Sequence, residues 1–269
     1  MKPRGARVSG RLALAMATCV WLGLCAGGLR ADDAAARGRE ILGKWEKSVI
    51  TLRLTMKMRM SAEGRQMQEE ESTQEIRATM IDPSGLVVCS LSEADPSQMF
   101  AAYMSEEEGY KWEVDITAVK IRLADGKEIP AKIVLRDKDL DLAFVRPTEK
   151  QAQAFTAISL SDAGKAEVLD DVVILNRLGE VVNRVASAVL DQIAAIAQKP
   201  RMLYVPGPNG QSNALGCPVF ALDGKLVGIL VNRVVSGGAA SMSEDSGMLT
   251  VILPTADVLE VANQAPQAQ

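Results

Sequence analysis

The sequence predicts an all-β protein, either a barrel or a sandwich. Three observations carry this prediction: the strand-like runs are short, they are evenly spaced, and glycine turns separate them with little helix between. The apolar share of 48% is ordinary for a folded protein, and nothing indicates disorder over most of the length. At 269 residues, the chain is long enough for one large β domain or for two small packed barrels.

Residues 1–31 have the pattern of a secretory signal peptide. A basic stretch precedes an apolar run over 12–24, and small residues follow up to a cleavage point after Ala31. The apolar run is too short to favour a membrane span. A lipoprotein signal would use Cys25, but it requires a small residue where this chain has Leu24. We therefore expect a periplasmic or secreted protein with no stable membrane anchor after cleavage.

The mature chain expected from this cleavage is acidic. The whole chain has a formal net charge of −4, and removing the five positive charges of residues 1–31, which hold no acidic residue, leaves −9. An acidic surface argues against nucleic acid or anionic lipid as the main partner. The chain contains no histidine. We expect no cofactor and no metal.

The first elements after the signal are a helix and a strand. Residues 32–47 carry Ile41 and Trp45 at helical spacing, which predicts a short amphipathic helix. Residues 48–60 predict a strand, and the polar, glutamate-rich residues 61–72 predict a solvated loop. The alternating methionines at 56, 58 and 60 could bind Cu(I). An apolar strand face is the favoured interpretation, because no histidine or paired cysteine lies nearby.

The next segment predicts two hairpins around an irregular stretch. Residues 75–90 predict two strands around a turn at 82–85, where proline and glycine hold their preferred turn positions. The aromatic residues within 96–115 indicate either a recognition loop or, as we favour, a satellite core. Residues 119–125 and 129–134 predict the second hairpin.

The later strands follow the same pattern. Strand-like runs begin at Val168, Val181, Met202 and Met248, and a short helix is expected to end at Asn263. Between them, the run from Pro218 to Val231 predicts a hairpin with a two-residue Asp223-Gly224 corner.

Three stretches resemble, in the same order, the catalytic stretches of trypsin-like serine proteases of the HtrA (Deg) kind. I-D-P-S-G-L-V-V from Ile81 resembles I-D-x-x-G-x-I-L, R-D-K-D-L-D-L-A from Arg136 resembles R-D-x-x-x-D-L-A, and N-A-L-G-C-P from Asn213 resembles G-N-S-G-G-P. The matching positions are Ile81, Asp82, Gly85, Val87, Val88, Arg136, Asp137, Asp141, Leu142, Ala143, Gly216, Pro218, Asp223, Gly224 and Gly228. The resemblance covers about residues 48–263.

The resemblance implies two packed six-stranded antiparallel β-barrels, the chymotrypsin/trypsin-like fold, with short N- and C-terminal helices. We expect the first barrel at 48–148, an inter-barrel linker at 149–160, the second barrel with its helix at 161–263, and a disordered tail at 264–269. No PDZ-like segment follows, so the peptide-binding regulatory domain common in HtrA proteins is expected to be absent.

The resemblance also implies that the catalytic triad is degenerate. The mechanism requires a hydroxyl, an imidazole and a carboxylate. Here the serine position holds Leu215, the histidine position holds Ser92, and only the aspartate position, Asp141, keeps its residue type. We favour a structural role for Asp141, in which it accepts backbone hydrogen bonds. Asn213 occupies a position whose N–H would belong to the oxyanion hole.

Two function classes follow from this sequence. The favoured one is an exported trypsin-like pseudoprotease that acts as a protein- or peptide-binding or scaffold module. The alternative is an active HtrA-like endopeptidase or hydrolase with a non-standard nucleophile, for which Ser212 and Cys217 are the candidates near the motif. A cysteine would still need a base or an electropositive setting to form thiolate.

The family fold implies a candidate disulfide. Cys89 and Cys217 lie beside the stretches that carry the histidine and serine positions, and these stretches converge at the catalytic cleft of the family. In an oxidising compartment they could form a bridge. Two buried free thiols are an equally weighted alternative.

Overall fold

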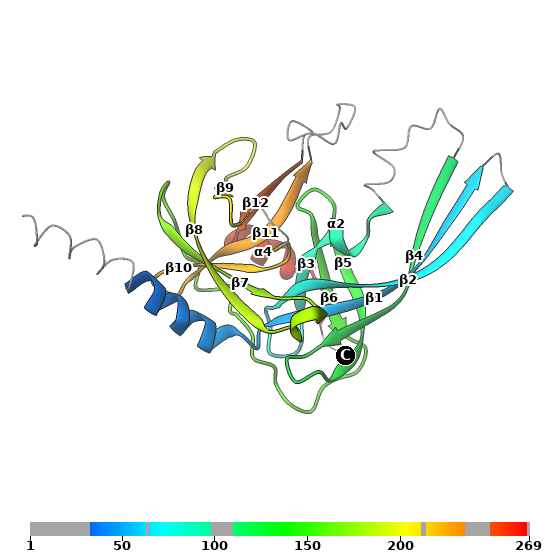
Figure 1. Ribbon diagram of the computed structural model, residues 1–269, viewed down its shortest axis with the longest axis horizontal. Coiled ribbons are helices and arrows are strands. Elements are labelled where there is room, and N and C mark those ends of the chain that lie inside the picture. Colours follow the sequence, from blue (N-terminus) through cyan, green and yellow to red (C-terminus); the bar gives the residue numbers. More distant parts are fainter. Residues whose placement is uncertain (1–32, 63–64, 98–109, 211–213, 235–247, 268–269) are drawn as a thin grey trace, which may run out of the picture.

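The structure of the chain is a computed structural model that describes residues 33–62, 65–97, 110–210, 214–234 and 248–267. Within these residues, twelve strands form two closed barrels of six strands each (Figure 1). All pairings between the strands are antiparallel. The predicted fold class, two packed six-stranded antiparallel barrels with few short helices, is therefore confirmed.

The first barrel uses the first half of the chain. Its strands pair in the order β1-β2-β3-β6-β5-β4. They are β1 (Val49–Ala62), β2 (Arg65–Met80), β3 (Val87–Ser90), β4 (Tyr110–Arg122), β5 (Glu128–Asp137) and β6 (Leu142–Pro147). A short helix, α2 (Leu91–Ala94), follows β3 directly.

The second barrel repeats this arrangement with the second half. Its strands pair in the order β10-β11-β12-β9-β8-β7. They are β7 (Asp171–Arg177), β8 (Ala186–Ala197), β9 (Leu203–Pro206), β10 (Pro218–Ala221), β11 (Leu226–Val234) and β12 (Met248–Pro254). A single 3-10 turn, η2 (Glu180–Val182), lies between β7 and β8, and helix α4 (Thr255–Ala262) follows β12.

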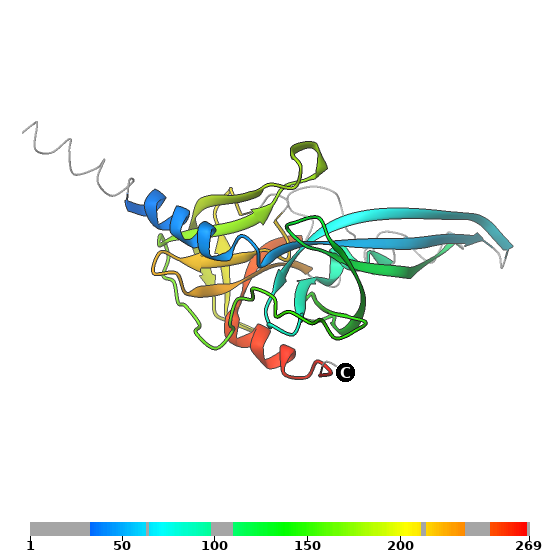
Figure 2. The ribbon, with the colours of Figure 1, turned by 90° about the horizontal axis from the view of Figure 1, so that it is seen from below.

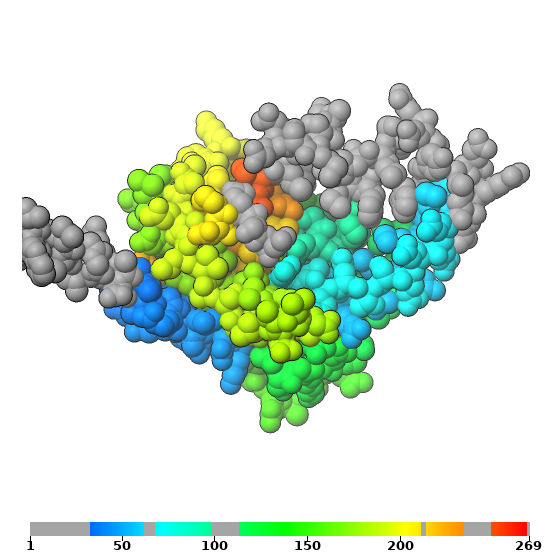
Figure 3. Space-filling view, in the orientation of Figure 1, coloured from blue at the N-terminus to red at the C-terminus, as the bar shows by residue number. Residues whose placement is uncertain are grey.

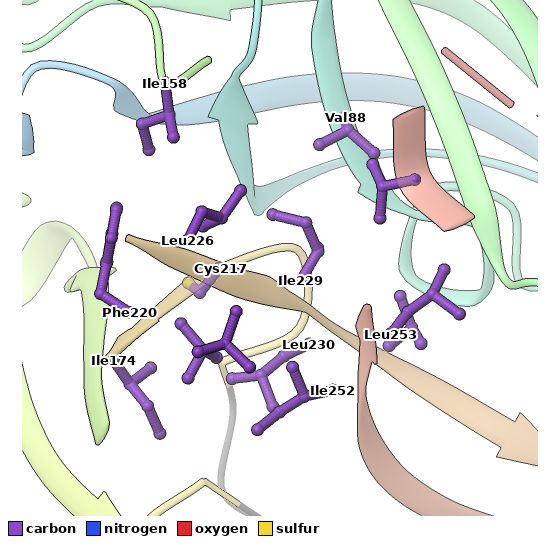
Figure 4. Packing of buried hydrophobic residues seen from close by; sticks show 14 of the residues in the cluster. Val88, Ile158, Ile174, Cys217, Phe220, Leu226, Ile229, Leu230, Ile252 and Leu253 are labelled. Atoms are coloured by element: carbon purple, nitrogen blue, oxygen red, sulfur yellow. The ribbon is translucent and has the colours of Figure 1, made fainter. Parts of the chain in front are cut away.

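Strands β3 and β6 lie between the two cores. In β3, Val87 and Cys89 belong to the apolar cluster of the first barrel, whereas Val88 belongs to a cluster made mostly of second-barrel residues. Because successive side chains of a strand point to opposite faces, both faces of this strand are apolar and buried. Figure 4 shows Val88 and Cys217 in one cluster with Ile229.

The prediction of a solvated loop at 61–72 was wrong. Strands β1, β2 and β4 extend beyond the barrel as a projecting arm, which is seen at the right of Figures 1 and 2. Cross-strand ion pairs hold this arm: Lys57 lies 3.7 Å from Glu69 and 3.9 Å from Glu71, and Arg59 pairs with Asp115. Charges on an exposed strand face pair across the strands, so a polar sequence does not require a loop here.

The methionines of β1 fit an apolar strand face. Met56 is 3% exposed and belongs to the first-barrel cluster, while Met58 and Met60 are partly exposed. The aromatic stretch expected over 96–115 falls largely outside the described residues.

The N-terminal helix, over residues 33–45, packs on the second barrel. Ile41 is buried in the second-barrel cluster, and the Trp45 ring stacks on Phe220 with centroids 6.4 Å apart. The helix is therefore fastened to the barrel by its apolar face. No helix within the described ranges is long and apolar enough to cross a membrane.

The segments at the barrel boundaries differ from expectation. The connection between the barrels covers residues 148–170, so it extends beyond the predicted 149–160, and backbone hydrogen bonds such as Ile158 N–H to the Met80 carbonyl hold it on the first barrel. The predicted disordered tail is partly ordered. Ala265 is 5% exposed, and the Arg146 Nε donates to the Pro266 carbonyl at 2.7 Å, which holds the chain beyond α4 on the surface.

The β10–β11 turn is also wider than predicted. The Gly224 N–H donates to the Ala221 carbonyl at 2.9 Å, so Leu222 and Asp223 are the central residues. Gly224 follows with φ of 84°. Glycine has no Cβ, so it adopts this left-handed conformation without the steric strain that a larger residue would have.

Candidate functional site

The candidate site forms where β3 ends beside the start of β6. Ser90 is paired with Leu142 in the antiparallel register, and the Leu91 N–H donates to the Asp141 carbonyl at 2.9 Å. This pairing brings Ser92 next to Asp141, although the two are far apart in sequence. The sequence prediction that they occupy one site is consistent with this contact.

Asp141 is buried and accepts hydrogen bonds from both barrels. Its Oδ1 accepts the Ser92 backbone N–H at 2.6 Å, and its Oδ2 accepts the Ser90 hydroxyl at 2.7 Å. The backbone N–H of Asn232, on β11 of the second barrel, donates to Oδ2 at 2.8 Å. As predicted, the carboxylate accepts backbone hydrogen bonds. It also links the two barrels.

Two features of the Asp141 environment shift the pKa of its carboxyl in opposite directions. Burial raises the pKa of this carboxyl, and the hydrogen bonds from Ser90, Asn232 and Ser92 partly offset that effect. Asp141 also has a φ of 57°, a left-handed conformation that is uncommon for a residue with a side chain. The network therefore holds a strained residue in place.

Ser92 fills the space beside the carboxylate with a hydroxyl. Its Oγ lies 3.0 Å from the Ser90 Oγ and 3.3 Å from the Asp141 Oδ2, and the Asn232 Nδ2 donates to it at 3.3 Å. A hydroxyl at this place cannot take up a proton near neutral pH as an imidazole does. The group beside the carboxylate is therefore a hydroxyl and not an imidazole.

The segment around Leu215 is fixed between the barrels. Gly216 has φ of 74°, and a Cβ there would lie 2.6 Å from the Arg77 carbonyl oxygen and 3.3 Å from the Cys89 Cα. Its carbonyl accepts the Thr79 hydroxyl at 2.7 Å. Only glycine fits this close approach. Leu215 is partly exposed, and Asn213 lies outside the described residues.

The two cysteines are free thiols in this structure rather than a disulfide. The Cys89 Sγ lies 3.6 Å from the Ala143 carbonyl in the first barrel, and the Cys217 Sγ lies 3.4 Å from the Asn176 Oδ1 in the second. The side chains thus occupy different cores, although their backbones approach each other. Burial raises the pKa of both thiols above the ordinary value of 9.0, so neither is poised as a thiolate.

Sequence reasoning missed Glu93, Ser90 and Asn232. Burial raises the pKa of Glu93 to about 7, opposed by Arg77, whose Nη1 lies 3.9 Å from the carboxylate. The Glu93 Oε2 is buried and has no hydrogen-bond partner among the described residues. One sequence signal pointed to Asn232: it is a polar residue at the end of the apolar run of β11. No signal marked the burial of Glu93.

Among the described residues, no cluster of three or more histidine, cysteine, aspartate or glutamate side chains could hold a metal ion. The site is therefore made of a carboxylate, two hydroxyls and backbone N–H groups. Its carboxylate and hydroxyls can bind and orient polar groups.

Comparison with known proteins places the chain in a family. Residues 91–229, more than half of the chain, match the trypsin-like peptidase domain. The chain is also similar to a solved structure, the apo MamO protease domain from Magnetospirillum magneticum, with 12% identity and a TM-score of 0.50 over 81% of this chain and 96% of that one. At this identity the similarity shows the shared fold. No curated protein matched the sequence. The match over half the length and the two closed barrels show that this chain belongs to the trypsin-like peptidase domain family.

Proposed function

We propose that this protein is an exported trypsin-like pseudoprotease that binds a peptide or protein segment and does not cleave it. Export rests on the signal-like pattern of residues 1–31. Sequencing the N-terminus of the protein recovered from its compartment tests export, and cleavage after Ala31 is the expected result. An intact Met1 on the recovered protein would contradict it.

The hydrogen bonding of Asp141 is the single observation that carries the loss of catalysis. In a triad, the carboxylate orients an imidazole. Here the side chain beside the carboxylate is the Ser92 hydroxyl, 3.3 Å from Oδ2, and the remaining donors are the Ser90 hydroxyl and the backbone N–H groups of Ser92 and Asn232. Because the chain has no histidine, no other segment of it can supply the imidazole.

No observation favours the alternative of an active hydrolase. The side chain of Cys217 is 0% exposed and burial raises its pKa, so it is neither accessible nor ionised near neutral pH. Ser212 lies outside the described residues.

The binding role is supported by the preserved surroundings of the site. Gly216 keeps a left-handed conformation and close packing on the first barrel, and Asp141 ties this barrel to β11. Both features hold the two barrels in a fixed relation at the place where the family binds its substrates. A rigid surface of this kind costs little entropy when a segment binds.

Hydrolysis of fluorescent, unfolded casein by the mature chain tests the proposal. We expect no cleavage by the wild type or by Leu215→Ser, because a serine without its base gains little. The paired change Leu215→Ser with Ser92→His, beside the native Asp141, is the matched variant in which activity should appear if these positions are the triad. Cleavage by the wild type after rigorous purification would overturn the loss of catalysis.

Retention of the same casein on immobilised protein tests binding separately. We expect the casein to bind reversibly and to be recovered intact. If neither casein nor any member of a random peptide library binds, the binding role is wrong even when cleavage is absent.

A further inference from the structure

The second barrel carries an elongated groove that the candidate site does not use. It consists of two cavities of about 830 and about 340 Å³. Both cavities are lined by Leu169, Asp171 and Leu190, so they adjoin each other at the start of β7 and the middle of β8. One end lies at Asp33 of the N-terminal helix, and the other at residues 207–209. In Figure 3 this helix (blue) lies beside the second barrel (green to yellow).

The centre of the groove is apolar and unusually exposed. Leu169 is 70% exposed and Leu190 is 38% exposed. Leu169 also has φ of 73°, a conformation that costs energy for a leucine. Its backbone is held there because its N–H donates to the Ile193 carbonyl at 2.8 Å. The fold therefore presents a leucine side chain to solvent at a fixed position, where a partner could bury it.

Carboxylates surround this apolar centre. Asp33, Asp170, Asp171 and Asp223 line the larger cavity, and its described lining includes no lysine or arginine. In the described part of the chain, none of the four forms an ion pair with a basic side chain. Like charges gathered in one cleft create a negative potential that attracts cations.

Two basic side chains of the neighbouring segments are paired with acids outside the lining of the groove. Arg37, one turn along the N-terminal helix, lies 2.9 Å from Glu40, and Lys225, after the β10–β11 turn, lies 3.6 Å from Asp162. Arg37 also interacts with Asp33, and the exposed Lys165 follows the groove's edge beside Ala166, so the described chain offsets the four carboxylates only in part.

We propose that this groove binds a partner protein through an extended, cationic peptide segment that carries lysine or arginine next to leucine-like side chains. The apolar side chains would cover Leu169 and Leu190, and the basic side chains would face the four aspartates. This site is separate from the residues around Asp141, and the inference stands whether or not the chain cleaves peptides.

Charge and shape decide among the possible occupants. A second copy of the chain is disfavoured, because the mature chain carries a net charge of −9 and would bring negative charge to a negative groove. The same field repels anionic lipid. A compact small molecule would fill one of the two cavities, whereas a peptide segment spans both.

Fluorescence anisotropy of a short labelled peptide that alternates lysine and leucine tests the proposal on the mature protein. Two matched probes replace each lysine by glutamate or each leucine by serine. We expect the lysine-leucine peptide to bind, its affinity to fall as salt is raised, and both control peptides to bind at least about tenfold more weakly.

Two variants locate the binding without disturbing the fold. Leu169→Asn removes the apolar side chain and tolerates the left-handed backbone, and Asp171→Asn keeps an oxygen for the Gln192 Nε2, which donates to it at 2.9 Å. Each should weaken peptide binding about tenfold. Val181→Asn, at a 99% exposed residue of η2, and Asp125→Asn, in the β4–β5 turn, are the matched controls and should leave binding unchanged.

Three results would overturn the proposal: no binding of the lysine-leucine peptide, equal binding of the glutamate-leucine peptide, or full binding by Leu169→Asn and Asp171→Asn. Binding of zwitterionic vesicles through Leu169 in the absence of peptide binding would also overturn it, because the occupant would then be a lipid surface. Circular dichroism of each variant separates lost binding from lost folding.

Discussion

Replacing Glu93 by glutamine should change how the stability of the protein depends on pH. The Glu93 carboxyl lies beside Ser92, its side chain is 21% exposed, and its Oε2 is buried without a partner among the described residues. Burial raises its pKa from the ordinary 4.5 to about 7, Arg77 opposes this, and Asp141 adds to it. The Glu93 carboxyl therefore stays protonated in the folded protein at pH values where it is ionised in the unfolded chain.

The size of the effect follows from the difference between the two pKa values. Between pH 4.5 and about 7 the folded state binds more protons than the unfolded state, so the free energy of unfolding falls as pH rises through this window. At about 1.4 kcal/mol per pH unit, the ionised Glu93 costs the wild type up to about 3 kcal/mol above neutral pH. Glutamine cannot ionise, so Glu93→Gln should avoid this cost.

Urea unfolding followed by tryptophan fluorescence at about pH 5 and about pH 8 measures the effect. Relative to the wild type, Glu93→Gln should gain up to about 3 kcal/mol of stability between the two pH values. Glu70→Gln, which removes one charge from the exposed arm, is the matched control and should follow the wild type. If the wild-type and Glu93→Gln stabilities differ by the same amount at both pH values, the carboxyl is not buried as described.

Three further perturbations test the site. Asp141→Asn leaves one acceptor oxygen for the donors at this carboxylate and should lower the free energy of unfolding by about 1–3 kcal/mol; unchanged urea stability would contradict the network. Gly216→Ala should lower the free energy of unfolding more than Gly224→Ala, which is the control. Both glycines have positive φ, so each substitution strains the backbone, by about 1–2 kcal/mol for Gly224→Ala, but only a Cβ at Gly216 would also meet neighbouring backbone atoms. Equal thermal shifts of the two variants would refute the close packing of Gly216. Thiol titration of the unfolded, unreduced mature chain should find Cys89 and Cys217 free and, in the folded protein, unreactive; a chain with no titratable thiol would show the disulfide instead.

Strand periodicity predicted an all-β barrel or sandwich, and the family resemblance was needed to predict two packed six-stranded barrels, which the structure confirms. The fully buried strand β3 (V-V-C-S) and the L-A-F-V run of β6 are characteristic of strands buried on both faces, and both lie between the two cores. The projecting arm was predicted as a loop because its charged side chains form ion pairs with residues on the neighbouring strands, which the local sequence does not reveal. Arg59 and Asp115 are far apart in sequence, so the pairing appears only when β1 and β4 are aligned.

The candidate site was only partly predictable for a similar reason. Asp141 and Ser92 were placed by resemblance to a family, and their contact follows from the pairing of β3 with β6. The role of Asn232 depends on how the second barrel docks on the first. Glu93 was missed because its burial is set by packing, which no local pattern encodes. The disulfide prediction used the approach of two segments but could not include the direction of the side chains.

The central claim, that the fold persists without its catalytic chemistry, is tested most directly with a serine-reactive fluorophosphonate probe. The mature wild-type protein is incubated with the probe, and intact mass spectrometry counts the adducts. Because the sequence resemblance puts Leu215 at the serine position and the chain has no histidine, the account predicts no adduct on the folded wild type, whereas the variant with Leu215→Ser and Ser92→His should be labelled at the new serine. One adduct per wild-type chain at a single serine would contradict the account.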